Sequence, residues 1–318
     1  MHIPNHLISP EVAIVGGVAA AALIVRAVVK LRKNGSFTRD KLPLAGALGA
    51  FVFAAQMVNY PLAEIGCSGH LVGGILLAAM LGPWLGFLTL SSVVALQALL
   101  FADGGLMALG CNILNMAAIS CLVVYPLVFK PLVGDSSSAA RQFGSAVVAS
   151  VLALMLGSLG VVAENALSGG AALPLAEFTT TMLPIHLLLG AIEGVVVGAI
   201  LAVVVSRAPS QLYLLHTKTK ALCTNTTRTA ILFAIAALVV GGVLSPMASN
   251  RPDGLEWSIA QTATAATPQT ATHSTVDLLQ QAIAIAPDYE GGYTGLAATA
   301  GILLFAWAIT PSRKKEVE

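Results

Sequence analysis

Long apolar stretches separated by short polar segments run along almost the whole chain. A helix needs roughly 20 mostly apolar residues to cross the hydrocarbon core of a membrane, and the hydropathy pattern marks nine such stretches. They fall at 11–29, 43–60, 71–86, 87–101, 107–129, 143–163, 180–206, 229–246 and 293–310. The pattern predicts an all-α integral membrane protein, a bundle of about nine transmembrane helices with seven in its first part and two at its C-terminal end.

The composition agrees with this pattern. Of the 318 residues, 57% are hydrophobic and 10% are charged, and the mean hydropathy is +0.86, far from the values of soluble globular domains. The net charge is only +1, which argues against a nucleic-acid partner and leaves the lipid bilayer as the expected surroundings. The four cysteines form no repeated C-x-x-C, so neither a disulfide framework nor a four-thiolate zinc site is expected.

Basic residues gather in alternate loops and predict the orientation. The loop 30–41 is rich in Lys and Arg, and positive charge in short loops marks the cytoplasmic side, so we expect the N-terminus outside. Counting spans onward places most other basic residues on that same cytoplasmic side: Lys130, Arg141, Arg207, Lys218, Lys220, Arg228, Arg313, Lys314 and Lys315. Only Arg251 falls outside.

The N-terminus is predicted to keep its first residue. No Lys or Arg precedes Arg26, so the positive region of a cleaved signal peptide is missing, and a second residue as large as His2 disfavours removal of Met1. Ser9 and Pro10 fit the N-cap and first turn of the first helix. We therefore expect a free amine followed by a histidine, on a short tail before the first span.

An uncharged stretch between Glu64 and Asp103 is barely long enough for two crossings at ~1.5 Å per residue. We therefore expect residues 66–70 to form a loop that dips from the outer face into the bundle, with Gly82-Pro83 turning the chain on the inner side. Irregular backbone at membrane depth is tolerated only inside protein or beside a wet cavity. The stretch thus predicts a site near His70.

The first two residues carry three nitrogen donors in a row. The Met1 amine, the His2 backbone nitrogen and Nδ1 of the His2 ring can bind one metal ion in adjacent chelate rings. Such a chelate needs a deprotonated amide, and square-planar or tetragonal nitrogen sites are typical of Ni(II) or Cu(II), whereas zinc prefers a tetrahedron. The start of the chain is therefore a candidate metal site.

The fourth corner of this chelate is open to a ligand from elsewhere in the chain. We expect His70 to fill it, because residues 3–9 can extend ~3.3 Å each, which is enough for the tail to fold inward over the cavity. His6 in place of His70, Cys67 as a soft ligand, and a mobile terminus with no metal at all are the alternatives.

Polar side chains inside the spans are the next candidates, because ionisable groups at bilayer depth are costly and usually face the bundle interior. His186 and Glu193 are two helical turns apart and are predicted to share a face, as are Asn112 and Asn115. Metal-bound imidazoles normally donate their other nitrogen to such groups, although bonds that only hold helices together are the alternative reading. The expected supporting set is Gln56, Gln97, Asn112, Asn115, His186 and Glu193.

Several of these segments together resemble the CbiM/NikM family, the metal-binding membrane components of energy-coupling-factor (ECF) transporters for nickel and cobalt. The resemblance covers roughly residues 1–207. A cytoplasmic linker at 208–228 would join it to 229–318, which resembles the two-helix accessory component called NikN or the PDGLE domain. The segments that carry the resemblance are Met1 to Pro4, Ser68 to Gly74, Asp103 to Leu106, Leu109 to Met116, His186 to Glu193, and Pro252 to Trp257.

The resemblance implies a site, a cargo and partners. Met1, His2 and His70 would bind Ni(II), or Co(II), through four nitrogens, on a multi-pass protein of a prokaryotic cytoplasmic membrane. A transmembrane coupling subunit (NikQ/CbiQ-like) and cytoplasmic ATPases (NikO/CbiO-like) would supply the energy, since this chain contains no G-x-x-x-x-G-K-[ST] loop for ATP. The chain itself is thus expected not to be an enzyme. The outer loop 247–292 would shape the outer entrance or help loading, with His273 solvated. Its acids would either collect cations or be ordinary solvated charges: Asp253, Glu256, Asp277, Asp288 and Glu290.

A rival from another class is an intramembrane serine protease. Gly66 to Gly69 is similar to the G-x-S-G motif of rhomboids, so Ser68 would be the nucleophile and His186 its base. Within the transport class, a copper or zinc carrier is the nearer alternative, and the amidate chelate disfavours zinc more strongly than copper.

Overall fold

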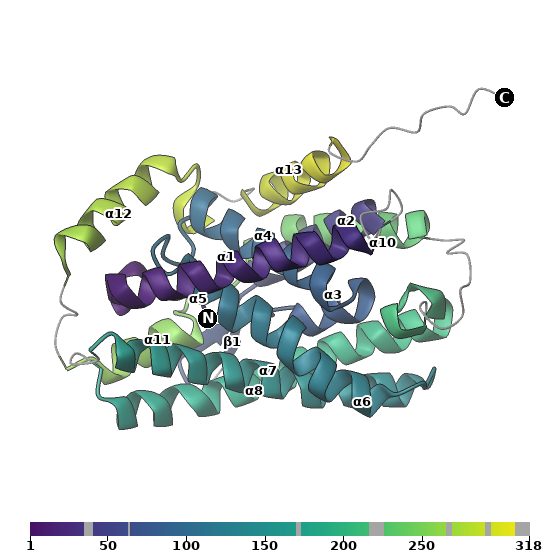
Figure 1. Cartoon of the computed structure of the whole chain (residues 1–318), viewed down its shortest axis with the longest axis horizontal. Helices are drawn as coiled ribbons and strands as arrows, with labels where there is room; N and C mark the ends of the chain where they lie inside the picture. The colour runs from purple at the N-terminus through teal and green to yellow at the C-terminus, as the bar shows by residue number, and fades with distance from the viewer. Residues whose placement is uncertain are drawn as a thin grey trace.

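The chain is an all-α membrane protein, a helical bundle with a small hairpin (Figure 1). The computed structural model describes residues 1–34, 41–62, 64–169, 173–215, 226–264, 269–289 and 294–308. Six helices there are long and apolar enough to cross a membrane: α1 (Pro10–Lys33), α4 (Pro83–Leu100), Leu109–Val133, α7 (Ala139–Leu167), α8 (Leu175–Arg207) and Thr226–Met247. Two shorter apolar helices are α2 (Lys41–Gln56) and α13 (Thr294–Ala308).

The all-α, multi-pass architecture predicted from hydropathy is therefore confirmed. The count of nine crossings and the outside position of the N-terminus stay predictions. Part of the basic pattern behind that orientation lies outside the described residues, namely Arg39, Lys218, Lys220, Arg313, Lys314 and Lys315.

Two of the long helices change their winding along their length. Leu109–Val133 joins α5 (Leu109–Asn112), a π-helix (Ile113–Phe129) and α6 (Lys130–Val133). Thr226–Met247 joins α10 (Thr226–Val239), a π-helical segment (Val240–Leu244) and a 3₁₀ turn (Ser245–Met247). A π-helix closes its hydrogen bonds one residue later than an α-helix, so side chains three positions apart no longer share a face.

The stretch around His70 corrects the predicted helix 71–86. Helix α3 (Gly74–Leu81) has eight residues, or about 12 Å at 1.5 Å per residue, against a core of about 30 Å. Before it, β1 (Tyr60–Leu62) pairs antiparallel with β2 (Cys67–Gly69), so the expected dipping loop is the buried second strand of a hairpin. The chain turns at Gly82, whose φ is +85°, as predicted.

The segment between the last two apolar helices is structured, which corrects the expectation of a solvated loop. It contains α11 (Gly254–Thr262) and α12 (Ala271–Ile283), followed by a 3₁₀ turn at Pro287–Tyr289. Helix α11 packs against α8, and α12 packs against α4 and the N-terminal tail. Helix α12 turns its polar side inward: Gln280 is buried, while Leu278 and Leu279 are exposed.

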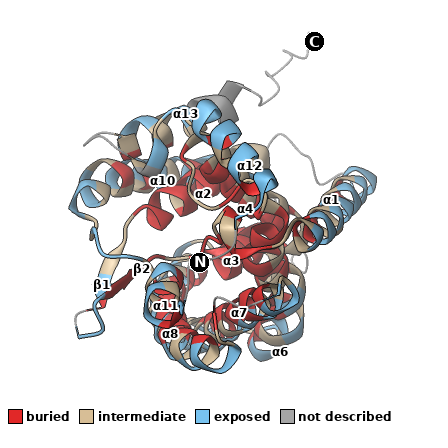
Figure 2. Ribbon diagram, turned by 90° about the vertical axis from the view of Figure 1, so that its left-hand side faces the viewer, coloured by how far each residue is buried: buried red, intermediate tan, exposed pale blue. Residues whose placement is uncertain are grey.

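The N-terminal tail lies inside the bundle. Figure 2 shows the chain starting near the buried helices α2, α3 and α4, with α7, α8 and α11 on its other side. Met1, His2 and Ile3 are all buried. A 3₁₀ turn (Asn5–Leu7) leads to Ser9, whose hydroxyl accepts from the Val12 nitrogen to cap α1. The predicted cap is thereby confirmed.

Candidate metal centre

The tail is held at Ile3 by hydrogen bonds to the backbone nitrogen and carbonyl of Ile3. The Ile3 nitrogen donates to Oδ1 of Asn112 at 2.8 Å. Its carbonyl accepts from the Gly105 nitrogen at 2.7 Å and from Nδ2 of Asn112 at 3.3 Å. A Cβ on Gly105 would collide with the backbone of Asn5, so glycine is needed where the tail crosses this loop.

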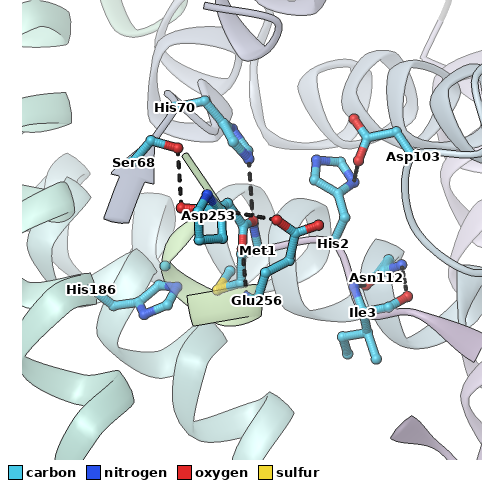
Figure 3. A network of polar contacts seen from close by, with 12 residues as sticks. Met1, His2, Ile3, Ser68, His70, Asp103, Asn112, His186, Asp253 and Glu256 are labelled. Atoms are coloured by element: carbon cyan, nitrogen blue, oxygen red, sulfur yellow. Dashed lines mark hydrogen bonds and ion pairs between the residues drawn. The ribbon is translucent and has the colours of Figure 1, made fainter. Parts of the chain in front are cut away.

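Beyond Ile3, the three expected metal-binding residues come together. The Met1 amine lies 3.3 Å from Nε2 of His70, and the rings of His2 and His70 have centroids 5.3 Å apart. Figure 3 shows both rings beside the Met1 amine. Within the described part of the chain, neither ring nitrogen of buried His2 has a hydrogen-bond partner, and Nδ1 lies 3.7 Å from Oδ1 of Asp103. Buried polar atoms are normally satisfied, so these two nitrogens are exceptions among the buried polar groups.

Both rings are kept neutral by their surroundings. Burial, then the adjacent N-terminal amine, lowers the pKa of His2 to about 3. Burial, the same amine and His2 likewise lower the pKa of His70 to about 3. A neutral imidazole is the form that binds metal, so near neutral pH both rings are ready to donate without first losing a proton.

An open cavity of about 430 Å³ leads to these residues from outside. Its wall contains His2 and His70 together with carboxylates from three parts of the chain, Asp103, Asp253 and Asp277. Such a wall attracts cations. Burial raises the pKa of Asp103 even though its carboxylate accepts from the Tyr289 hydroxyl, at 2.7 Å.

Two of the expected supporting residues hold the backbone behind His70. Glu193 of α8 accepts from the nitrogens of Val72 at 2.7 Å and Gly73 at 3.0 Å, and Gln56 of α2 donates to the Val72 carbonyl at 2.8 Å. Both side chains are buried. They fix the loop that carries His70 rather than its ring, whose Nδ1 faces the Leu71 carbonyl at 3.1 Å.

The other four expected supporting residues have different surroundings from one another. Asn112 anchors the tail, whereas Asn115 donates to Glu164 at 2.7 Å, so the two amides have different partners. Nδ1 of His186 lies 2.9 Å from its own helix's Met182 carbonyl, although His186 lines a small void beside Met1 and His70. Gln97 is buried on α4 and is absent from the cavity wall.

The alternatives to this assignment fit less well. His6 lines the outer cavity, whereas Nε2 of His70 lies 3.3 Å from the Met1 amine and the His70 ring lies beside that of His2. Burial raises the pKa of the Cys67 thiol, which disfavours the thiolate a metal needs. The Ser68 hydroxyl donates to the Arg251 carbonyl at 2.7 Å, so the proton that a protease base would take is engaged elsewhere.

Sequence reasoning missed what the C-terminal segment contributes. Asp253 accepts from the Met1 amine at 2.8 Å. Asn5 donates to Asp277 at 2.6 Å and to Gln280 at 2.9 Å. His273, expected in solvent, is buried with Nε2 2.9 Å from the Ile8 carbonyl. The signal was present in the P-D-G-L-E run at 252–256, but its partners lie about 250 positions away.

Long apolar helices around a buried nitrogen-rich centre with an acidic entrance define a membrane protein for metal transport. Comparison with known proteins gives the same class. A solved structure of a transition metal transporter is 28% identical, with a TM-score of 0.56 over 68% of this chain and 97% of that one. A protein of Haloquadratum walsbyi that is named as a metal transport protein is 33% identical to this chain. The match covers 67% of this chain and 94% of that protein.

Two protein-family models match the sequence and show which family it belongs to. The CbiM model, described as the cobalt uptake substrate-specific transmembrane region, matches residues 2–211, and the PDGLE domain model matches residues 227–310. The chain belongs to the CbiM family and has the fused CbiM/NikM plus NikN-type organisation. The fused nickel transport protein NikMN of Rhodobacter capsulatus is 32% identical over 52% of this chain and 46% of its own length.

Proposed function

We propose that this protein binds Ni(II), with Co(II) as the alternative cargo, at its outer face and delivers it across the membrane as the substrate-binding subunit of an ATP-driven ECF transporter. The ligands would be the Met1 amine, the His2 amide nitrogen, Nδ1 of His2 and Nε2 of His70. The chain itself would carry out no ATP hydrolysis.

The observation that carries the proposal is the separation of the Met1 amine and Nε2 of His70, 3.3 Å. Adjacent corners of a square around a metal with bonds of ~2.0 Å lie ~2.8 Å apart, so a shift of about half an ångström suffices. The His2 ring, whose nitrogens make no hydrogen bond within the described residues, stands beside the ring of His70. An amidate with three further nitrogens favours Ni(II) over Zn(II).

Transport would require partners. A coupling subunit of the NikQ/CbiQ type and ATPases of the NikO/CbiO type would drive the release of the ion inward, since a binding site alone moves nothing uphill. The PDGLE-type part at 229–318, which follows the cytoplasmic linker 208–228, would act at the outer entrance, where α12 and the N-cap residue of α11 lie against the tail.

The sharpest test adds one glycine before Met1. The extension moves the free amine away from the His2 amide and so destroys the chelate, although it also displaces the amine from Asp253. Nickel binding by purified protein, measured by equilibrium titration, should then be lost, while the metal-free protein still unfolds in a cooperative thermal transition. Unchanged nickel affinity in the extended protein would end the proposal.

A further inference from the structure

The Met1 amine has a second partner, which comes from the opposite end of the chain. We propose that Asp253 is a positioning residue of the metal site: its carboxylate holds the N-terminal amine beside His70, so that the C-terminal unit builds part of the site. The inference rests on the proposed function and assigns a task to the aspartate of the P-D-G-L-E run.

The carboxylate of Asp253 is fixed through both of its oxygens. Oδ2 accepts from the Met1 amine at 2.8 Å, and Oδ1 accepts from the Glu256 nitrogen at 2.8 Å. The Glu256 carboxylate in turn accepts from the Asp253 nitrogen at 3.0 Å, which completes a capping box at the start of α11. One oxygen therefore orients the carboxylate, and the other remains for the amine.

The same turn is joined to the strand that leads to His70. The Ser68 nitrogen donates to the Pro252 carbonyl at 2.8 Å, and the Ser68 hydroxyl donates to the Arg251 carbonyl at 2.7 Å. Ser68 is fully buried and stands two residues before His70. Thus Asp253 and His70, which flank the amine in Figure 3, are carried by segments bonded directly to each other.

The residues after Asp253 hold the turn against α8. A Cβ on Gly254 would lie 2.8 Å from Cγ2 of Ile185, so only glycine allows this close approach. Leu255 is fully buried. Each position of the run thus has a contact: Pro252 with β2, Asp253 with the amine, Gly254 with α8, Leu255 with the core, and Glu256 with the cap.

A held amine matters because chain termini are usually mobile, and ordering a tail opposes metal capture. An amine bound to a metal still carries N–H bonds, so Asp253 can accept from it before and after the ion arrives. Partners that orient metal ligands in this way are typically worth ~10–100-fold in metal affinity.

The test compares Asp253→Asn with Glu256→Gln in the full chain. Both variants remove one negative charge from the same cavity. Asparagine remains a good N-cap and glutamine still closes a capping box, so α11 should form in both. Only Asp253→Asn changes the carboxylate that binds both the Met1 amine and the Glu256 nitrogen, because one of its two acceptor oxygens becomes a donor.

We expect nickel affinity by equilibrium titration to fall ~10–100-fold in Asp253→Asn and by less than about threefold in Glu256→Gln. Acylation of the Met1 amine in metal-free protein, followed by mass spectrometry of the first peptide, should be faster in Asp253→Asn alone. If Asp253→Asn does not fold, Asp253→Ser keeps a cap oxygen but lacks the second acceptor, and the same losses are expected.

Equal losses in both variants would overturn the inference in favour of bulk charge attraction, and so would wild-type affinity and labelling in Asp253→Asn. The glycine-extended chain separates the two proposals. If the extension abolishes nickel binding while Asp253→Asn binds normally, the chelate stands and the role of Asp253 falls. If the extended chain binds like the wild type, the chelate itself falls.

Discussion

The Met1 amine lies 3.3 Å from Nε2 of His70, although 69 positions separate the two residues. No local feature of either segment brings them together. The tail reaches His70 because Asn112 and Gly105 bind Ile3, and His70 reaches the tail because Glu193 holds the backbone after it. The separation is therefore the product of both anchoring systems, and each can be tested on its own.

His70→Ala should lower nickel affinity by at least ~10–100-fold, the loss typical of removing a residue that only hydrogen-bonds to a metal ligand. The loss should be at least that large because His70 would itself supply the fourth nitrogen. His6→Ala is the matched control, since His6 lines the same cavity farther out along the tail. Equilibrium titration of both purified variants decides between the two histidines. Equal losses, or a larger loss in His6→Ala, would reassign the fourth ligand.

Gly105→Ala should displace the tail, because the added Cβ would collide with the Asn5 backbone. We expect weaker nickel binding together with faster hydrogen exchange in the N-terminal peptide, as the bond from the Gly105 nitrogen to the Ile3 carbonyl is lost. Gly17→Ala is the control, since its added Cβ meets nothing within 4 Å. Wild-type affinity in Gly105→Ala would show that the tail can dock by another path.

Glu193→Gln should destabilise the protein and loosen His70. A carboxylate accepts from both the Val72 and Gly73 nitrogens, whereas an amide offers one acceptor and leaves one buried N–H unpaired, at a cost of about 1–3 kcal/mol. Thermal unfolding and nickel titration would both record the change. Glu164→Gln is the control, because its remaining oxygen can still accept from Asn115; an equal effect there would contradict a specific role for Glu193.

Acidification should release the tail from the cavity. Burial and the neighbouring amine lower the pKa of His2 and of His70 to about 3 in the docked state, from an ordinary value of 6.5. The undocked rings therefore bind protons first, so docking is at full strength above about pH 6.5 and weakens as the pH falls toward 3. Nickel affinity should fall in the same direction, since chelation also releases protons.

Hydrogen exchange measures this release directly. Between pH 7.5 and 5, protection of the N-terminal peptide, corrected for intrinsic exchange rates, should decrease, while protection of α7 stays constant. Protection of the N-terminal peptide that does not change with pH would show that the tail is not held through its neutral rings.

Much of this molecule follows from local pattern. The spans at 143–163 and 180–206 are contained in α7 and α8, because an uninterrupted apolar stretch of that length has few alternatives to a helix. Ser9 capped α1 as its residue type predicts. Around α3 the pattern misled, because residues buried inside protein on every side are as apolar as residues that face lipid.

What the sequence by itself determined is the membrane bundle and the identity of the candidate nitrogen donors, since hydropathy and a terminal Met-His pair are written in consecutive residues. Only the tertiary structure decided that Met1 meets His70, that Asn112 and Asn115 bind different partners, and that Asp253 and Gln280 reach back to the tail. Such contacts join segments far apart in the chain, and the packing of the whole bundle selects them, because no short stretch of residues specifies which distant backbone or amine its side chains will meet.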